Sequence, residues 1–505
     1  MSRVDRIALV LSLITILVTF YVTNRYFEAI PHLEDEIAYV WQARAIADGN
    51  LTVASPPQAE SFLVPFVVDH NGQRFGKYPL GWPVMLAIGV RLGIRSLINP
   101  LFAGLGVWLT YRLGKKVFSE TVGVIASVLT LTSPFFLMNS GSLLSHSFGL
   151  VLSTAFVLSW VDNFTEQNSA DRKLPVLVAG LTLGVLVLTR PLTALAVAFP
   201  FAIHGIYLLI RKDWHTRRQV VAIGGLALGI GALIFLWQYA VTGDALQNPY
   251  TLWWEYDKFG FGPGHGVTEN GHSFNLARIN TRFSLRVGYS DLFGWPKYSW
   301  VFLPIGLLAV ILRRNWRGLL VSTVFPSLVI FYSAYWVGAW IFGPRYYFEG
   351  LFSLTLLSGA GIAWLAGWPI AAGESWRTYT GWMRFRPLLV TALVSILVVG
   401  NIYYYTPLRL SNLRGLYGMD RSDLQPFLSE QALELTPALI VVHPKNWMEY
   451  GVLLDLQTPD LESPFIFIFS RNQQSDEALR SEFPERDFYH YYPSEPYIFF
   501  KSPKP

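Results

Sequence analysis

The sequence predicts an α-helical polytopic membrane protein with a small α/β domain at its C-terminal end. Three observations support this fold class. Of the 505 residues, 52% are hydrophobic and only 14% are charged, whereas soluble domains carry about 25% charged residues. Apolar runs long enough to cross a bilayer recur up to residue 406. Residues 407–505 instead alternate short strand-like runs with polar, helix-compatible stretches.

Eleven apolar runs have the length of a membrane-spanning helix, about 17 to 25 residues. One further run, 79–94, is short, rich in Gly and Pro, and interrupted by Arg91. The first run follows Arg3 and Arg6 without a small-residue cleavage site, so we expect a retained anchor rather than a signal peptide. The eleven runs lie near residues 7–27, 97–114, 121–138, 143–161, 174–190, 191–210, 219–241, 299–312, 318–341, 346–369 and 386–406.

The distribution of Lys and Arg sets the expected topology, because cytoplasmic loops carry an excess of both. If 79–94 stays at the membrane surface, four basic clusters fall on the same side as Arg3 and Arg6. If it crosses, all four move to the opposite side. We therefore expect eleven spans in the plasma membrane, a cytoplasmic N-terminus, an extracytoplasmic C-terminus, and an interfacial or re-entrant helix over 79–94. The clusters are Arg112/Lys115/Lys116, Arg211/Lys212/Arg217/Arg218, Arg313/Arg314/Arg317 and Arg377/Arg384/Arg386.

This topology predicts two domains. Residues 1–406 form a membrane domain with long outer loops at 28–96 and 242–298, and residues 407–505 form an extracytoplasmic α/β domain. The glycine-rich second loop is expected to be mobile. In the tail we expect strands over 438–442, 465–469 and 497–500, and helices near 423–434 and 475–482.

The composition excludes several kinds of chemistry. With no Cys in the chain, disulfides, thiolate metal sites and a cysteine nucleophile are all absent. The net charge of +5 follows mainly from Lys and Arg in the expected cytoplasmic loops. We therefore do not infer nucleic-acid binding.

An acidic cluster, Glu34-Asp35-Glu36, directly follows the first apolar run. Crowding three like charges at the mouth of a membrane protein is costly. The run that follows, from Tyr39 to Ala47, has a helical pattern and stops at Asp48-Gly49-Asn50. The acids are therefore expected to face water, either as a cap on that helix or as catalytic groups.

Three cations lie at expected outer helix ends. Lys77, beside Tyr78, is either an interfacial anchor or a phosphate contact. Arg190 interrupts an apolar run, so it is either functional or a salt bridge that fixes a hairpin. Arg345, followed by Tyr346, either binds phosphate through its planar guanidinium or anchors the helix end against Glu349.

Histidines provide weaker candidates. His146 begins an expected span on the outer side and is either a hydrogen-bonded helix-end residue or a substrate contact. His265, Glu269 and His272 lie in the second outer loop. Their loop spacing is only weak evidence for a metal site, so we expect no metal ligands and no cofactor in this chain and regard His265 and His272 as possible substrate contacts.

The first outer loop resembles that of the GT-C membrane glycosyltransferases. The resemblance rests on the Asp35-Glu36 pair after the first span, on Tyr39 and on the short helix that ends in Gly49. The branch most similar to this chain contains the protein O-mannosyltransferases and the aminoarabinose transferases that act on lipid A. The resemblance implies that Asp35 is the catalytic base, with Glu36 beside it and Tyr39 as a possible substrate contact.

The same resemblance places Lys77, Arg345 and Tyr346 at the lipid-phosphate site and Arg190 in a Thr-Arg-Pro element at the outer face. The motif around Lys77 is shifted by one residue from the pattern of the family. His146 stands where the family often has an acid, which favours a metal-independent enzyme.

The residues and the resemblance together predict an inverting glycosyltransferase. A carboxylate base takes the proton of the attacking hydroxyl, and fixed cations stabilise the departing polyprenyl phosphate. The expected partners are a polyprenyl-phosphate sugar donor, membrane lipid and an extracytoplasmic glycan, lipid or protein acceptor. The alternatives are a flippase for lipid-linked glycans, a non-catalytic scaffold, and a polymerase or ligase that uses a diphosphate-linked glycan.

Overall fold

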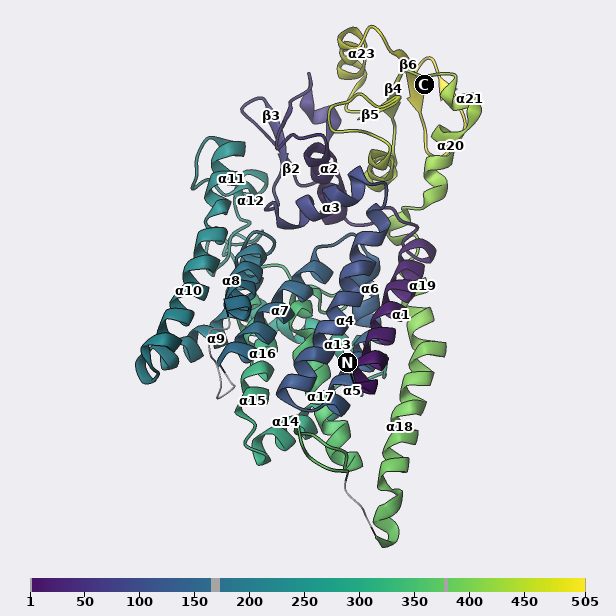
Figure 1. The fold of residues 1–505 in the computed structure, drawn as a ribbon. Coiled ribbons are helices and arrows are strands. Elements are labelled where there is room, and N and C mark those ends of the chain that lie inside the picture. Colours follow the sequence, from purple (N-terminus) through teal and green to yellow (C-terminus); the bar gives the residue numbers. More distant parts are fainter. Residues whose placement is uncertain (1, 165–172, 377–379, 505) are drawn as a thin grey trace.

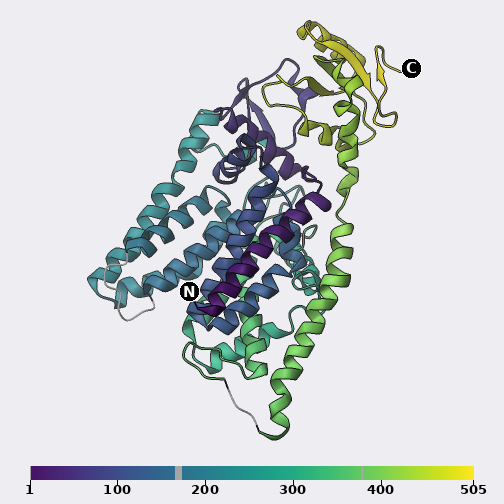
Figure 2. The same cartoon turned by 45° about the vertical axis from the view of Figure 1, so that its right-hand side comes forward.

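A computed structural model describes residues 2–164, 173–376 and 380–504. Arg377, one of the basic residues that set the expected topology, lies outside these ranges. Figures 1 and 2 show a bundle of helices with the C-terminal strands beyond one end. The short elements of the first outer loop lie between the bundle and those strands. The long helix α18 (Arg386–Gly400) runs along one edge of the bundle in both views.

Helices occupy all eleven predicted apolar runs. Among the described residues, six helices are long and apolar enough to cross a membrane. The number rises to seven if α5 (Glu120–Leu131) and α6 (Pro134–Gly141), which meet at 60°, form one span. The multi-pass class is therefore confirmed, while the count of eleven stays a prediction. The six are Arg3–Arg25 (α1), His146–Phe164 (α7), Pro191–Arg211 (α9), Trp214–Thr242 (α10 and α11), Arg345–Ala366 (η3 and α17) and Gly381–Leu428, which contains α18.

Five further helices occupy the remaining predicted runs, and the run that contains two of them ends its helical part earlier than predicted. The expected span over 318–341 is helical only as α15 (Trp316–Ser322) and α16 (Val324–Tyr332). Residues 333–344, which follow α16, are irregular. Some of their backbone groups form hydrogen bonds with side chains of the second outer loop, as when Asn280 donates to the carbonyl of Trp336. Irregular backbone at membrane depth is tolerated where protein buries it. The other helices are α4 (Ile98–Val117), α8 (Lys173–Val187) and α14 (Phe302–Leu312).

The first outer loop forms two helices and a small sheet. Helix α2 (Glu34–Ala47) ends, as predicted, where Gly49 adopts a positive φ of 89°. Strands β1 (Val53–Ala54), β2 (Val67–His70) and β3 (Gln73–Gly76) pair in the antiparallel order β1-β3-β2. Helix α3 (Gly81–Arg91) has 11 residues, about 16 Å at 1.5 Å per residue, which is too short to cross a bilayer.

Helix α3 begins directly against the end of α8. The N–H of Gly81 donates to the carbonyl of Leu188 at 2.7 Å. A Cβ at position 81 would clash with Leu188 and Thr189, so only Gly permits this approach. The contact brings the first outer loop next to Arg190.

The second outer loop contains more regular structure than the sequence analysis anticipated. It forms α12 (Pro249–Trp253) and α13 (Phe274–Asp291). Ser273 caps α13 by accepting from the N–H of Leu276. Arginines at positions 278, 282 and 286 then repeat every four residues along an exposed helix face.

The tail forms the expected α/β structure with one additional strand. Strands β4 (Ala438–Val442), β5 (Phe465–Phe469) and β7 (Phe499–Phe500) lie within the predicted segments. The unpredicted strand β6 (Asp487–Tyr491) runs parallel to β4 and antiparallel to β7, giving the order β5-β4-β6-β7. The expected helices appear as α20 (Gln425–Leu428), α21 (Glu430–Leu433) and α23 (Gln473–Glu482).

The tail packs on the first outer loop. Ile37 and Trp41 of α2 share a buried hydrophobic cluster with Leu453 and with residues of the C-terminal sheet. Asp455 also accepts from two cations of the first loop region, Arg44 at 3.2 Å and Arg95 at 2.7 Å. The tail therefore holds one side of α2, the helix that carries the acidic cluster.

Candidate active site

Asp35 lies in the first turn of α2 with its two carboxylate oxygens on different partners. The hydroxyl of Tyr78 donates to Oδ1 at 2.6 Å, and Arg345 Nη2 lies 3.3 Å from Oδ2. The side chain is 28% exposed, so it is accessible. Burial alone would raise the pKa of Asp35, but Arg345, the Tyr78 hydrogen bond, Lys77 and Arg190 outweigh it and hold that pKa below its usual value. Asp35 is therefore an ionised carboxylate in a cationic setting.

Glu36, the neighbouring residue, has a different environment. It is 1% exposed, and its Oε2 accepts from the backbone N–H groups of His32 at 2.8 Å and Leu33 at 3.0 Å. Its Oε1 accepts from the N–H of Leu143 at 2.6 Å. Burial raises the pKa of Glu36 to about 7 despite these three donors. Glu36 thus caps α2 and ties it to the 142–145 segment, so the expectation that all three acids face water is wrong for this residue.

Arg345 keeps one guanidinium nitrogen without a partner. Its Nη2 contacts Asp35, while its Nη1 is buried and has no hydrogen-bond partner within the described chain. The guanidinium also lies 5.7 Å from the ring of Tyr346, which stacks on Tyr332 at 5.0 Å between centroids. A buried, unpartnered N–H beside an ionised carboxylate is suited to an anionic ligand. The alternative pairing of Arg345 with Glu349 does not occur.

Glu349 instead pairs with Arg190 and His146. Its Oε1 lies 3.1 Å from Arg190 Nε and 3.1 Å from His146 Nδ1. Arg190 also donates to Ser145 at 3.1 Å and to Tyr332 at 3.2 Å. The salt bridge anticipated for Arg190 is thus present, and the guanidinium has protein partners on all three nitrogens. His146 is held at the helix end by the same carboxylate.

Lys77 is enclosed in an aromatic cage and paired with Asp257. Its Nζ lies 3.0 Å from Asp257 Oδ2, and the two side chains are only 4% and 1% exposed. Burial lowers the pKa of Lys77, although Asp257 opposes this effect. Tyr335 and Trp336 donate to the other oxygen of Asp257 at 2.8 and 3.1 Å. The ammonium lies 3.8 to 5.5 Å from the ring centroids of Phe66, Tyr250, Trp254 and Tyr78.

The cage joins three separate segments of the outer surface. Lys77 follows β3, Asp257 lies in the second outer loop, and Tyr335 and Trp336 belong to the irregular stretch before Arg345. Cation–π contacts and a buried ion pair order these segments relative to one another. Lys77 also precedes Tyr78, so the cage fixes the residue that orients Asp35.

The remaining sequence candidates lie at different places. Tyr39 is close to the site, since its ring packs against Tyr78 at 4.5 Å and its hydroxyl lies 3.4 Å from that of Ser145. His272 bonds the carbonyl of Ser333 through Nε2 at 2.9 Å and stacks on Phe261. His265 lies in the same loop, where its backbone N–H donates to the carbonyl of Gly262 at 3.3 Å. Neither of these two histidines has a contact with Asp35 or Arg345 among the described residues.

Three residues of this site were not predicted as functional. Tyr78 and Glu349 were noted only as neighbours of candidate cations, and Asp257 was not singled out. The only indication for Tyr78 in the sequence was its position in the outer loop, directly before Pro79. Asp257, at 180 positions from Lys77, carried no local signal. Within the described residues, no group of three or more His, Asp or Glu side chains is placed to hold a metal ion.

Part of the membrane domain is similar to a known protein family. Residues 83–238 match the family model described as dolichyl-phosphate-mannose-protein mannosyltransferase. Asp35 and Arg345 lie outside the matched region. No curated protein matches the sequence.

Solved structures of GT-C glycosyltransferases share the fold. ArnT from Cupriavidus metallidurans bound to undecaprenyl phosphate is 14% identical, with a TM-score of 0.59 over 94% of this chain and 88% of its own. The oligosaccharyltransferase of Archaeoglobus fulgidus in the apo form is 12% identical, with a TM-score of 0.55 over 93% of this chain and 65% of its own. AglB from the same organism, in complex with an inhibitory peptide and a dolichol-phosphate, gives 11% identity and a TM-score of 0.53 over 91% of this chain and 64% of its own.

These findings confirm the resemblance predicted from the first outer loop. Residues 83–238 are thus similar to the mannosyltransferase family, and the chain shares its fold with ArnT and the archaeal oligosaccharyltransferase.

Proposed function

We propose that the chain moves a sugar from a polyprenyl-phosphate-linked donor to an acceptor on the extracytoplasmic face of the membrane, with inversion at the anomeric carbon. The contact between Asp35 and Arg345 carries this proposal. It sets an ionised, partly exposed carboxylate beside a guanidinium that has an unpartnered nitrogen. These are the two groups that such a transfer requires: a base for the acceptor and a cation for the leaving phosphate.

In this mechanism Asp35 accepts the proton of the acceptor hydroxyl as its oxygen attacks the anomeric carbon. The bond between that carbon and the phosphate oxygen breaks, and the polyprenyl phosphate leaves with the electron pair. Tyr78 fixes one oxygen of Asp35 and leaves the second for the acceptor once the donor phosphate takes over Arg345. Burial and Asp35 raise the pKa of Tyr78, so it stays a hydrogen-bond donor.

Arg345 is the principal phosphate ligand in the proposal, with Tyr346 beside it. Arg190 and Lys77 remain predicted contributors to the same phosphate site. Their contacts differ, because Arg190 is bound to Glu349 and Lys77 is bound to Asp257. Either cation contributes through its field without leaving its partner, since charges near a low-dielectric site act over several ångströms. Tyr39, His146, His265 and His272 remain predicted substrate contacts, and Glu36 supports the helix that carries Asp35.

The nature of the donor is inferred from the similar proteins. One is described with undecaprenyl phosphate and another with a dolichol-phosphate and a peptide. Both lipids are polyprenyl monophosphates, which fit a single guanidinium group with an unpartnered nitrogen. The proposal keeps eleven spans in the plasma membrane, a cytoplasmic N-terminus, and the division into residues 1–406 and an extracytoplasmic 407–505.

Transfer from a panel of polyprenyl-phosphate sugars, measured with the purified protein in lipid nanodiscs, tests the proposal. Asp35→Asn and Arg345→Ala should each strongly reduce sugar transfer and donor hydrolysis. Arg286→Ala, which removes an exposed arginine of α13, should leave the rate unchanged. Parallel reactions with chelator test the expected metal independence. If no donor is turned over while labelled lipid crosses the bilayer, the flippase alternative replaces the transferase.

A further inference from the structure

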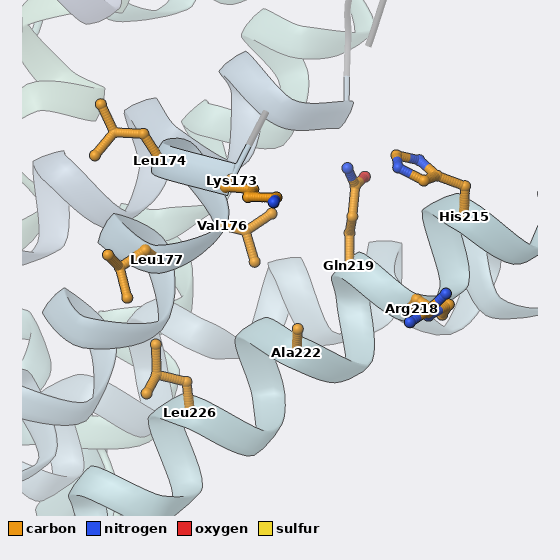
Figure 3. A pocket seen from close by; sticks show the side chains of 9 residues that line it. All are labelled: Lys173, Leu174, Val176, Leu177, His215, Arg218, Gln219, Ala222 and Leu226. Carbon is orange, nitrogen blue, oxygen red and sulfur yellow. The ribbon is translucent and has the colours of Figure 1, made fainter. Parts of the chain in front are cut away.

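A wedge-shaped cavity opens between α8 and α10 (Trp214–Gly231). Small residues let the two helices touch at one end: a Cβ on Gly184 would lie 2.6 Å from Ile230, and one on Gly180 would lie 2.8 Å from Leu226. Toward their first residues the helices are separated by a cavity of about 760 Å³. Its lining, drawn in Figure 3, consists of Lys173, Leu174, Val176, Leu177, His215, Arg218, Gln219, Ala222 and Leu226.

The inner part of this wedge is apolar and its mouth is basic. Leu177, Ala222 and Leu226 form the inner part, while Lys173 and Arg218 lie near the start of each helix. Figure 3 shows the Lys173 side chain reaching into the opening toward Gln219. Among the described residues that line the cavity none is acidic, and neither Lys173 nor Arg218 forms an ion pair with a described residue.

Two described polar residues near the mouth, Asp213 and Gln219, have hydrogen-bond partners of their own. Asp213, directly before α10, is used in capping that helix, where it accepts from the N–H of Thr216 at 3.0 Å and from its hydroxyl at 2.9 Å. Gln219 accepts from the Asn163 amide at 3.1 Å. Because α8 and α10 both begin at this end, their positive dipole ends add to the potential of the cationic side chains.

The wedge is distinct from the candidate active site. Arg190 lies just beyond the far end of α8, and the 15 residues of that helix span about 22 Å. That length is most of the hydrocarbon thickness of a bilayer, about 30 Å. The cavity therefore belongs to the leaflet opposite to Asp35 and Arg345, which is the cytoplasmic leaflet in the predicted topology.

We propose that this wedge is a specific site for an anionic membrane phospholipid. The head-group phosphate lies between Lys173 and Arg218, and an acyl chain fills the apolar space that ends at Leu226. Basic pockets between membrane helices on the cytoplasmic side are suited to acidic lipid head groups. The volume lies in the range of well-formed ligand sites, about 300 to 1,000 Å³. Nothing in the proposed sugar transfer requires this site.

Native mass spectrometry of the full-length protein, released from nanodiscs of mixed phosphatidylglycerol and phosphatidylcholine, tests the proposal. The wild type should retain phosphatidylglycerol in preference to phosphatidylcholine. Lys173→Ala and Arg218→Ala should each weaken that preference about fivefold, the factor that corresponds to about 1 kcal/mol per basic residue near anionic lipid.

Arg217→Ala is the matched control. Arg217 neighbours Arg218 on α10, but it bonds the carbonyls of Lys212 and Ile210 and does not line the cavity. Its removal should leave the preference intact. An equal loss in Arg217→Ala and Arg218→Ala would mean that general surface charge holds the lipid, and it would overturn the proposal.

A change of shape gives a second, independent readout. Ala222→Phe fills the wedge without altering its charge, so bound phosphatidylglycerol should fall even if a charge variant is poorly folded. Size-exclusion chromatography checks that each variant is monodisperse. Retention of phosphatidylglycerol at the wild-type level in a folded Ala222→Phe protein, or equal retention of the two lipids by the wild type, would contradict the assignment.

Discussion

Two carboxylate–cation pairs lie close together at the outer end of the bundle, and they differ in how completely they are satisfied. Asp257 and Lys77 are almost fully buried, and their remaining polar and apolar surfaces are covered by aromatic side chains. Asp35 and Arg345 meet at 3.3 Å, with the carboxylate partly exposed and one guanidinium nitrogen unpartnered. The closed pair is suited to holding structure, and the open pair is suited to exchanging partners with a substrate.

This difference distinguishes a charged residue that binds substrate from one that only stabilises the fold. Lys77 and Arg345 are both cations beside a Tyr at an expected outer helix end, and local sequence does not distinguish them. Their partners do. Removing one member of a buried ion pair strongly destabilises the folded protein, because the other charge stays buried without a partner. A partly exposed pair contributes less to the stability of the protein. The following predictions use that contrast, beginning with the largest expected effect.

Replacing Asp35 with Asn should reduce sugar transfer by about 10² to 10⁴-fold, the range expected for loss of a general base. The folded state should be retained, because Asn can still accept from Tyr78. Initial rates in nanodiscs together with thermal unfolding measure both effects. Transfer at the wild-type rate in Asp35→Asn would remove Asp35 from the chemistry.

Replacing either member of the closed pair should mainly affect stability. Lys77→Met and Asp257→Asn should each cost about 3 to 5 kcal/mol, because each leaves a buried charge without its partner. The double variant should cost less than the sum of the two single variants, since it leaves no uncompensated charge. Chemical unfolding of the four proteins completes the cycle. Additive costs would show that the pair has no coupling.

The pH dependence of single-turnover transfer tests whether Arg345 lowers the pKa of Asp35. A base must be deprotonated to act, and the pKa of Asp35 lies below its usual value of about 3.9. The rate should therefore show no acid limb from Asp35 between pH 5 and 8. In Arg345→Ala, burial is less opposed, so the pKa of Asp35 should rise and an acid limb should move to higher pH. A profile unchanged by that substitution would exclude this coupling.

Glu36 should give the smallest effect, visible in stability rather than in activity. Its pKa in the folded protein, about 7, lies above the usual value of about 4.5. The folded state therefore binds more protons than the unfolded state between these values, and stability should decline as the pH rises from about 4.5 to 7. Thermal unfolding at pH 5 and pH 8 should show a smaller decline for Glu36→Gln than for the wild type. An equal decline in both proteins would rule out this titration.

Much of the fold could be predicted, because the membrane constrains it strongly. Each expected apolar run contains a helix, since backbone polar groups must be satisfied internally in lipid. The early end at Tyr332 could not be anticipated from hydropathy, because the irregular stretch beyond it is stabilised by contacts such as Asn280 with the Trp336 carbonyl. Strand β6 was missed because its Tyr- and His-rich sequence is buried by pairing with β4, which is a tertiary contact.

Part of the candidate site could be predicted because the membrane topology places certain residues on the same side. Asp35 and Arg345 are 310 positions apart, yet the topology placed both at outer helix ends, and the structure brings them together. The partners of the other charges could not be inferred. Glu349 lies four residues after Arg345, and pairing with it was the alternative to phosphate binding, but its carboxylate contacts Arg190 and His146. Such choices depend on which helix faces meet.

The most direct test of the difference between the two pairs is the binding of an unlabelled polyprenyl phosphate to the purified protein in nanodiscs. Binding should be retained in Asp35→Asn and in Arg286→Ala. It should weaken about 10- to 100-fold in Arg345→Ala, as expected for loss of a charge-assisted contact worth about 1.5 to 3 kcal/mol. Equal binding by Arg345→Ala and the wild type would contradict the assignment of the phosphate to the open pair.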